Sequence, residues 1–132
     1  PDDFKDFETN RITADYVRWS RTKAIIDAAP ELALGSPTFG WLRAALRSCA
    51  MLSRPDYTKY VCVPMILFAA GGDKVVSTQA IEDFAVDLKL GSQILMPGSR
   101  HEILQETDAV RQRFWAAFDA YMGIEVPSSE RA

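Results

Sequence analysis

The 132-residue sequence lacks the features that mark disulfide-rich, metal-binding, membrane-spanning and nucleic-acid-binding proteins. Its two cysteines, Cys49 and Cys62, are too few for a disulfide framework and lack the spacing of a metal site, so we expect reduced thiols in a cytoplasmic-type protein. No apolar run approaches the ~18 residues of a membrane span. A net charge of −3 without a basic stripe gives no support for nucleic-acid binding. Length and composition are those of one globular domain.

The sequence also lacks a secretory signal and an initiating methionine, since it opens on Pro1. From this we expect a processed product, a fragment, or the ordered part of something longer.

Helical signals dominate the first 55 residues. Thr13 is predicted to cap a helix that stops at Pro30, and Ser36 followed by Pro37 predicts the start of a second helix. In that second helix, apolar residues recur at helical spacing: Trp41, Leu42, Ala45, Leu46 and Cys49. Such a stripe is expected to pack in the core. Core packing is also expected of Phe39 and Met51, and Cys62 is expected to be a small buried residue.

The second half changes to an α/β pattern. The continuous apolar run "PMILFAAGG" predicts a strand that is covered on both faces. A helix capped by Ser77 follows, then the strand "SQILMPG", then the helix "TDAVRQRFWAAFDAYMG". The order predicts parallel strands joined by a right-handed crossover. Two such strands cannot complete a covered sheet, so we expect more strands from an absent segment or a second chain.

Two side chains able to carry chemistry follow the predicted strands. Asp73 comes after the first strand, and His101, the only histidine, comes after the second. Functional groups of open α/β sheets collect beyond the carboxyl ends of strands, so the two loops should meet at one rim. A carboxylate there could orient the imidazole and stabilise its protonated form. The alternatives are a turn residue and a solvated surface histidine.

The second half resembles the C-terminal part of an α/β-hydrolase of the lysophospholipase and monoacylglycerol-lipase type. The stretch "VPMILFAAGGDKVVS" is similar to the context of the family's catalytic acid, and "GSRHEILQE" to that of its histidine. The segment "APELALGSPTFGWLRAA" is similar to part of the helical cap. The resemblance implies an α/β fold, a cap segment followed by a β-α-β-α unit, with a cap (lid) at 1–55, core at 56–126 and a tail at 127–132. It implies Asp73 and His101 as catalytic acid and base. In the cap, an acyl-chain cleft lined by Phe39, Trp41 and Met51 is the alternative to core packing. Apart from the resemblance, we expect Glu102 to support the histidine loop by hydrogen bonding.

The family nucleophile is a serine in a G-x-S-x-G elbow, and this sequence has no such elbow. Ser36, Ser92 and Ser99 each follow a glycine, but none has the second glycine at the required place. The elbow and the oxyanion donors are therefore expected upstream of Pro1. The chain alone is expected to be inactive.

The resemblance implies a carboxylic-ester hydrolase that acts on a lipid ester or another small ester, without cofactor or metal. The implied partner is the missing N-terminal part or a second copy, and the implied location is cytoplasmic, with peripheral membrane association left open. One alternative is a different α/β-hydrolase, such as a peptidase or a dehalogenase-like enzyme with an Asp nucleophile. The other is a non-catalytic α/β binding module in which Asp73 and His101 are incidental.

Overall fold

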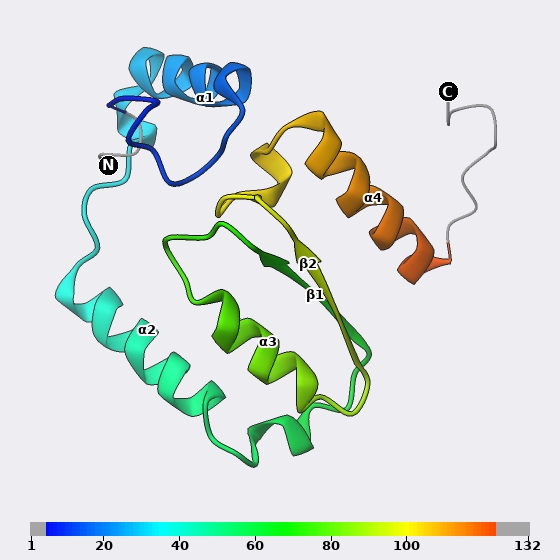
Figure 1. The fold of residues 1–132 in the computed structure, drawn as a ribbon. Coiled ribbons are helices and arrows are strands. Elements are labelled where there is room, and N and C mark those ends of the chain that lie inside the picture. The colour runs from blue at the N-terminus through cyan, green and yellow to red at the C-terminus, as the bar shows by residue number, and fades with distance from the viewer. Residues whose placement is uncertain (1–4, 124–132) are drawn as a thin grey trace, which may run out of the picture.

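The computed structural model describes residues 5–123 (Figure 1). Its first half contains the helices α1 (Tyr16–Ala28) and α2 (Phe39–Leu52), followed respectively by the short 3-10 turns η2 (Pro30–Leu32) and η3 (Tyr57–Tyr60). No strand lies in this half of the described chain. The helical reading of the first 55 residues is therefore confirmed.

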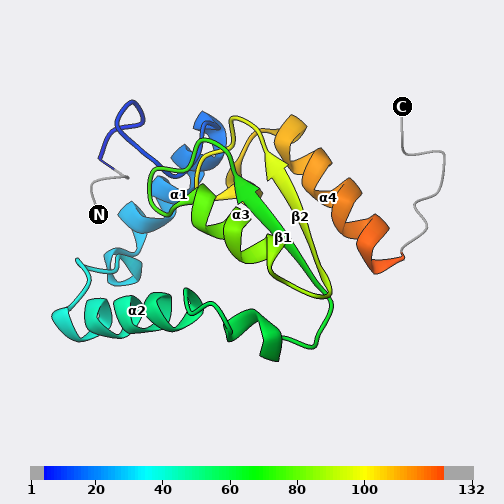
Figure 2. The ribbon, with the colours of Figure 1, turned by 60° about the horizontal axis from the view of Figure 1, so that its bottom comes forward.

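The second half is a β-α-β-α unit. It runs through β1 (Met65–Ala70), α3 (Thr78–Val86), β2 (Gly91–Met96), the 3-10 turn η4 (Ile103–Gln105) and α4 (Asp108–Met122). The two strands pair in parallel, from Met65 opposite Gly91 to Ala70 opposite Met96. Helices α3 and α4 lie on opposite faces of this sheet (Figures 1 and 2). The predicted α/β class and the parallel pairing are both confirmed.

The best-buried part of the sheet is its carboxyl end. Ala69, Ala70 and Met96 are each at most 4% exposed. Further along β1, the ring of Phe68 packs against Phe114 of α4 with centroids 4.4 Å apart. Apolar burial of this kind is the main favourable term in folding, so the strand ends stand on the firmest part of the molecule.

Two of the predicted helix starts are wrong by two residues. Asp15 caps α1 through its side chain, which accepts from Arg18 N, and Thr38 caps α2 by accepting from Trp41 N. The Thr13 hydroxyl instead donates to Gln105 O at 2.7 Å and accepts from Asp15 N at 2.9 Å, just before the helix begins. The third cap, Ser77, is confirmed, since its side chain accepts from Ala80 N.

The core packing expected for the α2 stripe is wrong. No residue of α2 is buried in the structure described, and Phe39, Trp41 and Met51 are 93%, 59% and 46% exposed. Cys62 is likewise exposed rather than buried, and both cysteines are free thiols. The helical period identifies an apolar face, but it does not say what lies against that face.

The division into a cap at 1–55 and a core from 56 remains a proposal, and the predicted tail at 127–132 lies outside the described residues. None of the helices between residues 5 and 123 is long and apolar enough to cross a membrane.

Candidate active site

The loops after β1 and β2 are joined backbone to backbone. Gly71 N donates to Met96 O at 3.0 Å, and Gly72 N donates to Ser99 O at 2.8 Å. A Cβ on Gly72 would lie 3.0 Å from Ser99 O, and one on Gly71 would lie 3.2 Å from Met96 O. The glycine pair is thus required by close approach, because any side chain would push the two loops apart. This contact sets the separation of the residues that follow.

Asp73 and His101 meet at this edge of the sheet. His101 Nδ1 lies 2.9 Å from Asp73 Oδ2, while the second carboxylate oxygen accepts from Val75 N at 2.7 Å and Val76 N at 3.1 Å. The Asp73 side chain is 4% exposed and that of His101 is 30% exposed. The expected meeting of the two loops at one rim, within hydrogen-bonding distance, is confirmed.

The environment of Asp73 keeps it ionised. Burial raises the pKa of this carboxyl, but the hydrogen bond from His101 and those from Val75 N and Val76 N outweigh it, and the net pKa lies below the ordinary 3.8. A carboxylate can only accept, so His101 Nδ1 carries the proton of the shared hydrogen bond. In the neutral imidazole Nε2 is then the nitrogen with the lone pair, and in the described structure it has no hydrogen-bonding partner. An imidazole in this state can take a proton.

The histidine loop also rests on a segment from the start of the chain, residues 10–14. Glu102 N donates to Ile12 O at 2.9 Å, and His101 N lies 3.5 Å from Arg11 O. The hydroxyl of Thr13 reaches the next turn, η4. Local sequence patterns do not predict these contacts, because they join residues about 90 positions apart.

The support expected from Glu102 comes from another glutamate. The Glu102 side chain is exposed, and only the backbone N–H of this residue binds segment 10–14. Glu106 is 1% exposed, and its carboxylate accepts from Arg100 N at 2.9 Å. Glu106 is the last residue of the histidine motif "GSRHEILQE", four residues after Glu102. The motif alone does not show which of the two glutamates is buried.

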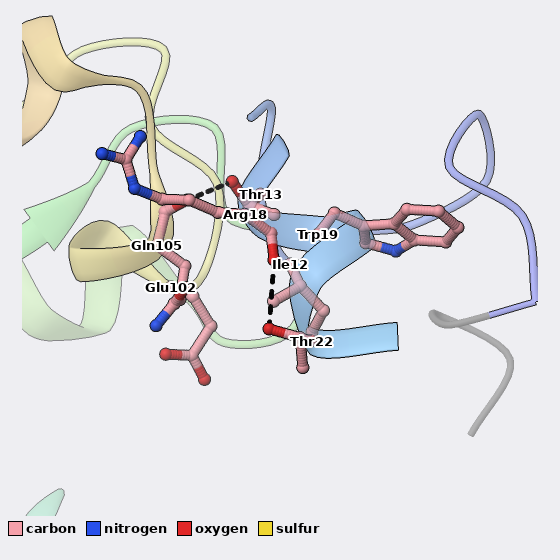
Figure 3. A pocket seen from close by; sticks show the side chains of 7 residues that line it. All are labelled: Ile12, Thr13, Arg18, Trp19, Thr22, Glu102 and Gln105. Atoms are coloured by element: carbon pink, nitrogen blue, oxygen red, sulfur yellow. Dashed lines mark hydrogen bonds between the residues drawn. The ribbon is translucent and has the colours of Figure 1, made fainter. Parts of the chain in front are cut away.

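A hollow of about 220 Å³ lies between α1 and the η4 turn, beside the histidine loop (Figure 3). Two hydroxyl groups on its wall already donate hydrogen bonds, that of Thr13 to Gln105 O and that of Thr22 to Arg18 O. Its full lining is Ile12, Thr13, Arg18, Trp19, Thr22, Glu102 and Gln105. The described residues contain no group of three or more His, Cys, Asp or Glu side chains that could hold a metal ion.

Ser99, the serine nearest to His101 in sequence, is not presented for attack. It is fully buried, and its hydroxyl donates to Arg100 O at 2.9 Å. A nucleophile has to reach the substrate carbonyl, so the geometry argues against Ser99 in that role.

A parallel β-α-β-α unit with a carboxylate–imidazole pair beyond its strand ends is an arrangement found in α/β-hydrolases. The comparison with known families agrees: residues 5–108 match the family described as "Serine aminopeptidase, S33". The chain belongs to this family.

Two relatives extend the likeness. The chain is 23% identical over 118 residues to the "Probable lysophospholipase L2" of Haemophilus influenzae, an alignment that covers 89% of this chain and 37% of the relative. The crystal structure of a soluble variant of monoglyceride lipase from Saccharomyces cerevisiae, in complex with a substrate analog, superposes with a TM-score of 0.70. That match has 20% identity and covers 86% of this chain and 40% of the lipase. The fold is therefore that of part of an α/β-hydrolase, and the chain spans about two fifths of the length of these relatives.

Proposed function

We propose that residues 1–132 supply the acid and base of a Ser-His-Asp triad in a carboxylic-ester hydrolase of the lysophospholipase or monoacylglycerol-lipase type. The observation that carries the proposal is the 2.9 Å contact between His101 Nδ1 and Asp73 Oδ2 beyond the ends of two parallel strands. In the proposed reaction, His101 Nε2 takes the proton of the serine hydroxyl as its oxygen attacks the ester carbonyl. The same proton then passes to the leaving alcohol, while Asp73 stabilises the imidazolium.

We place the nucleophilic serine outside residues 1–132. The sequence contains no G-x-S-x-G elbow, and Ser99 is buried with its hydroxyl already donated. An elbow serine also supplies one oxyanion donor through the residue that follows it, so the same outside segment would hold the developing negative charge. The proposed substrate is a lipid ester, in line with the names of the two relatives.

The test uses a form of the protein that carries these residues together with the proposed serine. We expect His101→Ala to abolish ester turnover, with a loss of about 10⁶-fold, and Asp73→Asn to lower it by about 10⁴-fold. The assay follows release of fatty acid from lysophospholipid and monoacylglycerol. Glu102→Gln, an exposed carboxylate on the same loop, is the matched control and should keep its turnover. Unchanged turnover in both triad variants would favour the non-catalytic binding module instead.

The family description supports a second candidate, an aminopeptidase that uses the same acid and base. The two candidates differ in the leaving group, which is an alcohol for the lipase and an amine for the peptidase. Parallel assays on aminoacyl anilides and on lipid esters separate them, because the preferred substrate has the higher kcat/KM. Preference for the anilide would replace the lipase proposal without changing the roles of Asp73 and His101.

A further inference from the structure

Glu106 is a buried carboxylate held by backbone groups. Its Oε1 accepts from Arg100 N at 2.9 Å and from Ala14 N at 3.0 Å, and its Oε2 accepts more weakly from Thr107 N at 3.3 Å. Within residues 5–123 it forms no ion pair. Removing a carboxylate from water is costly, and hydrogen bonds from backbone N–H groups offset that cost.

The two closer donors come from different parts of the chain. Arg100 immediately precedes His101, whereas Ala14 belongs to segment 10–14, which backs the histidine loop. One oxygen atom therefore ties the backbone beside the proposed base to a segment almost 90 residues away. The side chain of Arg100 makes the reciprocal link, since Nη1 donates to Asn10 O and Thr13 O, both at 3.0 Å.

His101 itself is held weakly through its backbone. The distance from His101 N to Arg11 O is 3.5 Å, at the limit of a hydrogen bond. Its position relative to Asp73 therefore depends on the stronger anchors on either side, at Arg100 N and Glu102 N. Of these two anchors, only the one at Arg100 depends on a side chain that mutation can remove.

We infer that Glu106 is a positioning residue, which fixes the loop at Arg100 so that His101 Nδ1 faces Asp73. The expected effect of Glu106 on turnover rests on the proposed function, whereas its expected effect on the His101–Asp73 hydrogen bond does not. Loss of the carboxylate would leave Arg100 N–H and Ala14 N–H buried without acceptors, and the loop would shift to satisfy them. A displacement of about 1 Å in a catalytic group costs up to about 10²-fold in rate.

Three substitutions separate positioning from bulk stability. Glu106→Leu removes the acceptor at similar size, and Glu106→Asp keeps the charge but is one methylene too short to reach both amides. Glu106→Gln keeps an oxygen where Oε1 lies and should rescue the site. Glu102→Leu is the control on the same loop, and Leu88→Ala is the stability control, because Leu88 is 8% exposed and packs against Gly91 at the opposite end of the sheet.

The first readout is the imidazole tautomer, measured by ¹⁵N NMR on the 132-residue chain, in which His101 is the only histidine. We expect the Nδ1–H form in the wild type, Glu106→Gln and both controls, and its loss or mixing in Glu106→Leu and Glu106→Asp. The second readout is kinetic, in the form that carries the proposed serine. There Glu106→Leu should lower kcat by about 10- to 100-fold with little change in KM.

A full Nδ1–H population in both Glu106→Leu and Glu106→Asp would overturn the inference, as would an equal fall in kcat in Leu88→Ala. If Glu106→Leu does not fold, the Asp variant alone decides. If the wild-type enzyme shows no hydrolysis, the proposed function fails, and the tautomer measurement still decides the role of Glu106.

Discussion

The hydrogen bonds of Asp73 allow a quantitative prediction of the free energy of unfolding and its dependence on pH. Asp73→Asn keeps an oxygen for Val75 N and Val76 N but replaces the charged acceptor of the His101 bond with an amide. A hydrogen bond to a charged group contributes about 1.5–3 kcal/mol and a neutral one about 0.5–1.5 kcal/mol. The substitution should therefore lower the free energy of unfolding by about 1–2 kcal/mol at neutral pH, which corresponds to about 3–10 °C in Tm for a chain of this size.

The pH dependence of that difference follows from the pKa of Asp73. Because the pKa is lowered in the folded chain, the carboxylate stabilises the fold fully above its unfolded pKa, near 3.9, and this stabilisation is lost as the pH falls through the folded pKa. The gap between wild type and Asp73→Asn should shrink as the pH falls below about 4.

Thermal unfolding followed by circular dichroism at a series of pH values measures this gap. Asp56→Asn is the control, since Asp56 is exposed and its side chain makes no capping hydrogen bond. Its Tm should follow that of the wild type at every pH. A gap that is absent at pH 7, or one that widens as the pH falls below about 4, would refute the reasoning, because it would mean that the ionised carboxylate does not stabilise the folded state.

Two further predictions concern the 132-residue chain by itself. It should show no esterase activity and no covalent labelling by a fluorophosphonate probe, and stoichiometric labelling that disappears in Ser99→Ala would make Ser99 the nucleophile. The chain should also self-associate, because within the described structure β1 pairs only with β2 and leaves one edge open, beside exposed apolar residues such as Val63. Size-exclusion chromatography over a range of concentrations measures this association, and a monomer at every concentration would contradict it.

The pairing of Asp73 with His101 could be predicted because it depends on few facts. Each residue directly follows a strand whose apolar run is visible in the sequence, and parallel pairing brings the two strand ends to one edge. The local signal of Ser77 likewise identified a real helix start. Predictions of this kind succeed where short-range patterns and the handedness of the crossover suffice.

The rest depends on contacts that a local pattern does not encode. Thr13 has a side chain typical of a helix cap, yet its hydroxyl donates to Gln105 O, 92 positions away. Glu102 and Glu106 are the same residue type in one short motif, and only the return of segment 10–14 buries the second. The apolar stripe of α2 shows which face is apolar, but covering that face requires a surface that residues 5–123 do not supply.

The two helices of the proposed cap differ in their long-range contacts. The helix α1 is fixed to the rest of the chain at its start. Segment 10–14, just before it, holds the histidine loop, and Arg18 pairs with Asp108 of α4 as well as with Asp15, the N-cap of α1 itself. By contrast, α2 buries no side chain and presents an apolar face. Local stability follows buried contact, so α2 should open and exchange its amide hydrogens more readily than α1.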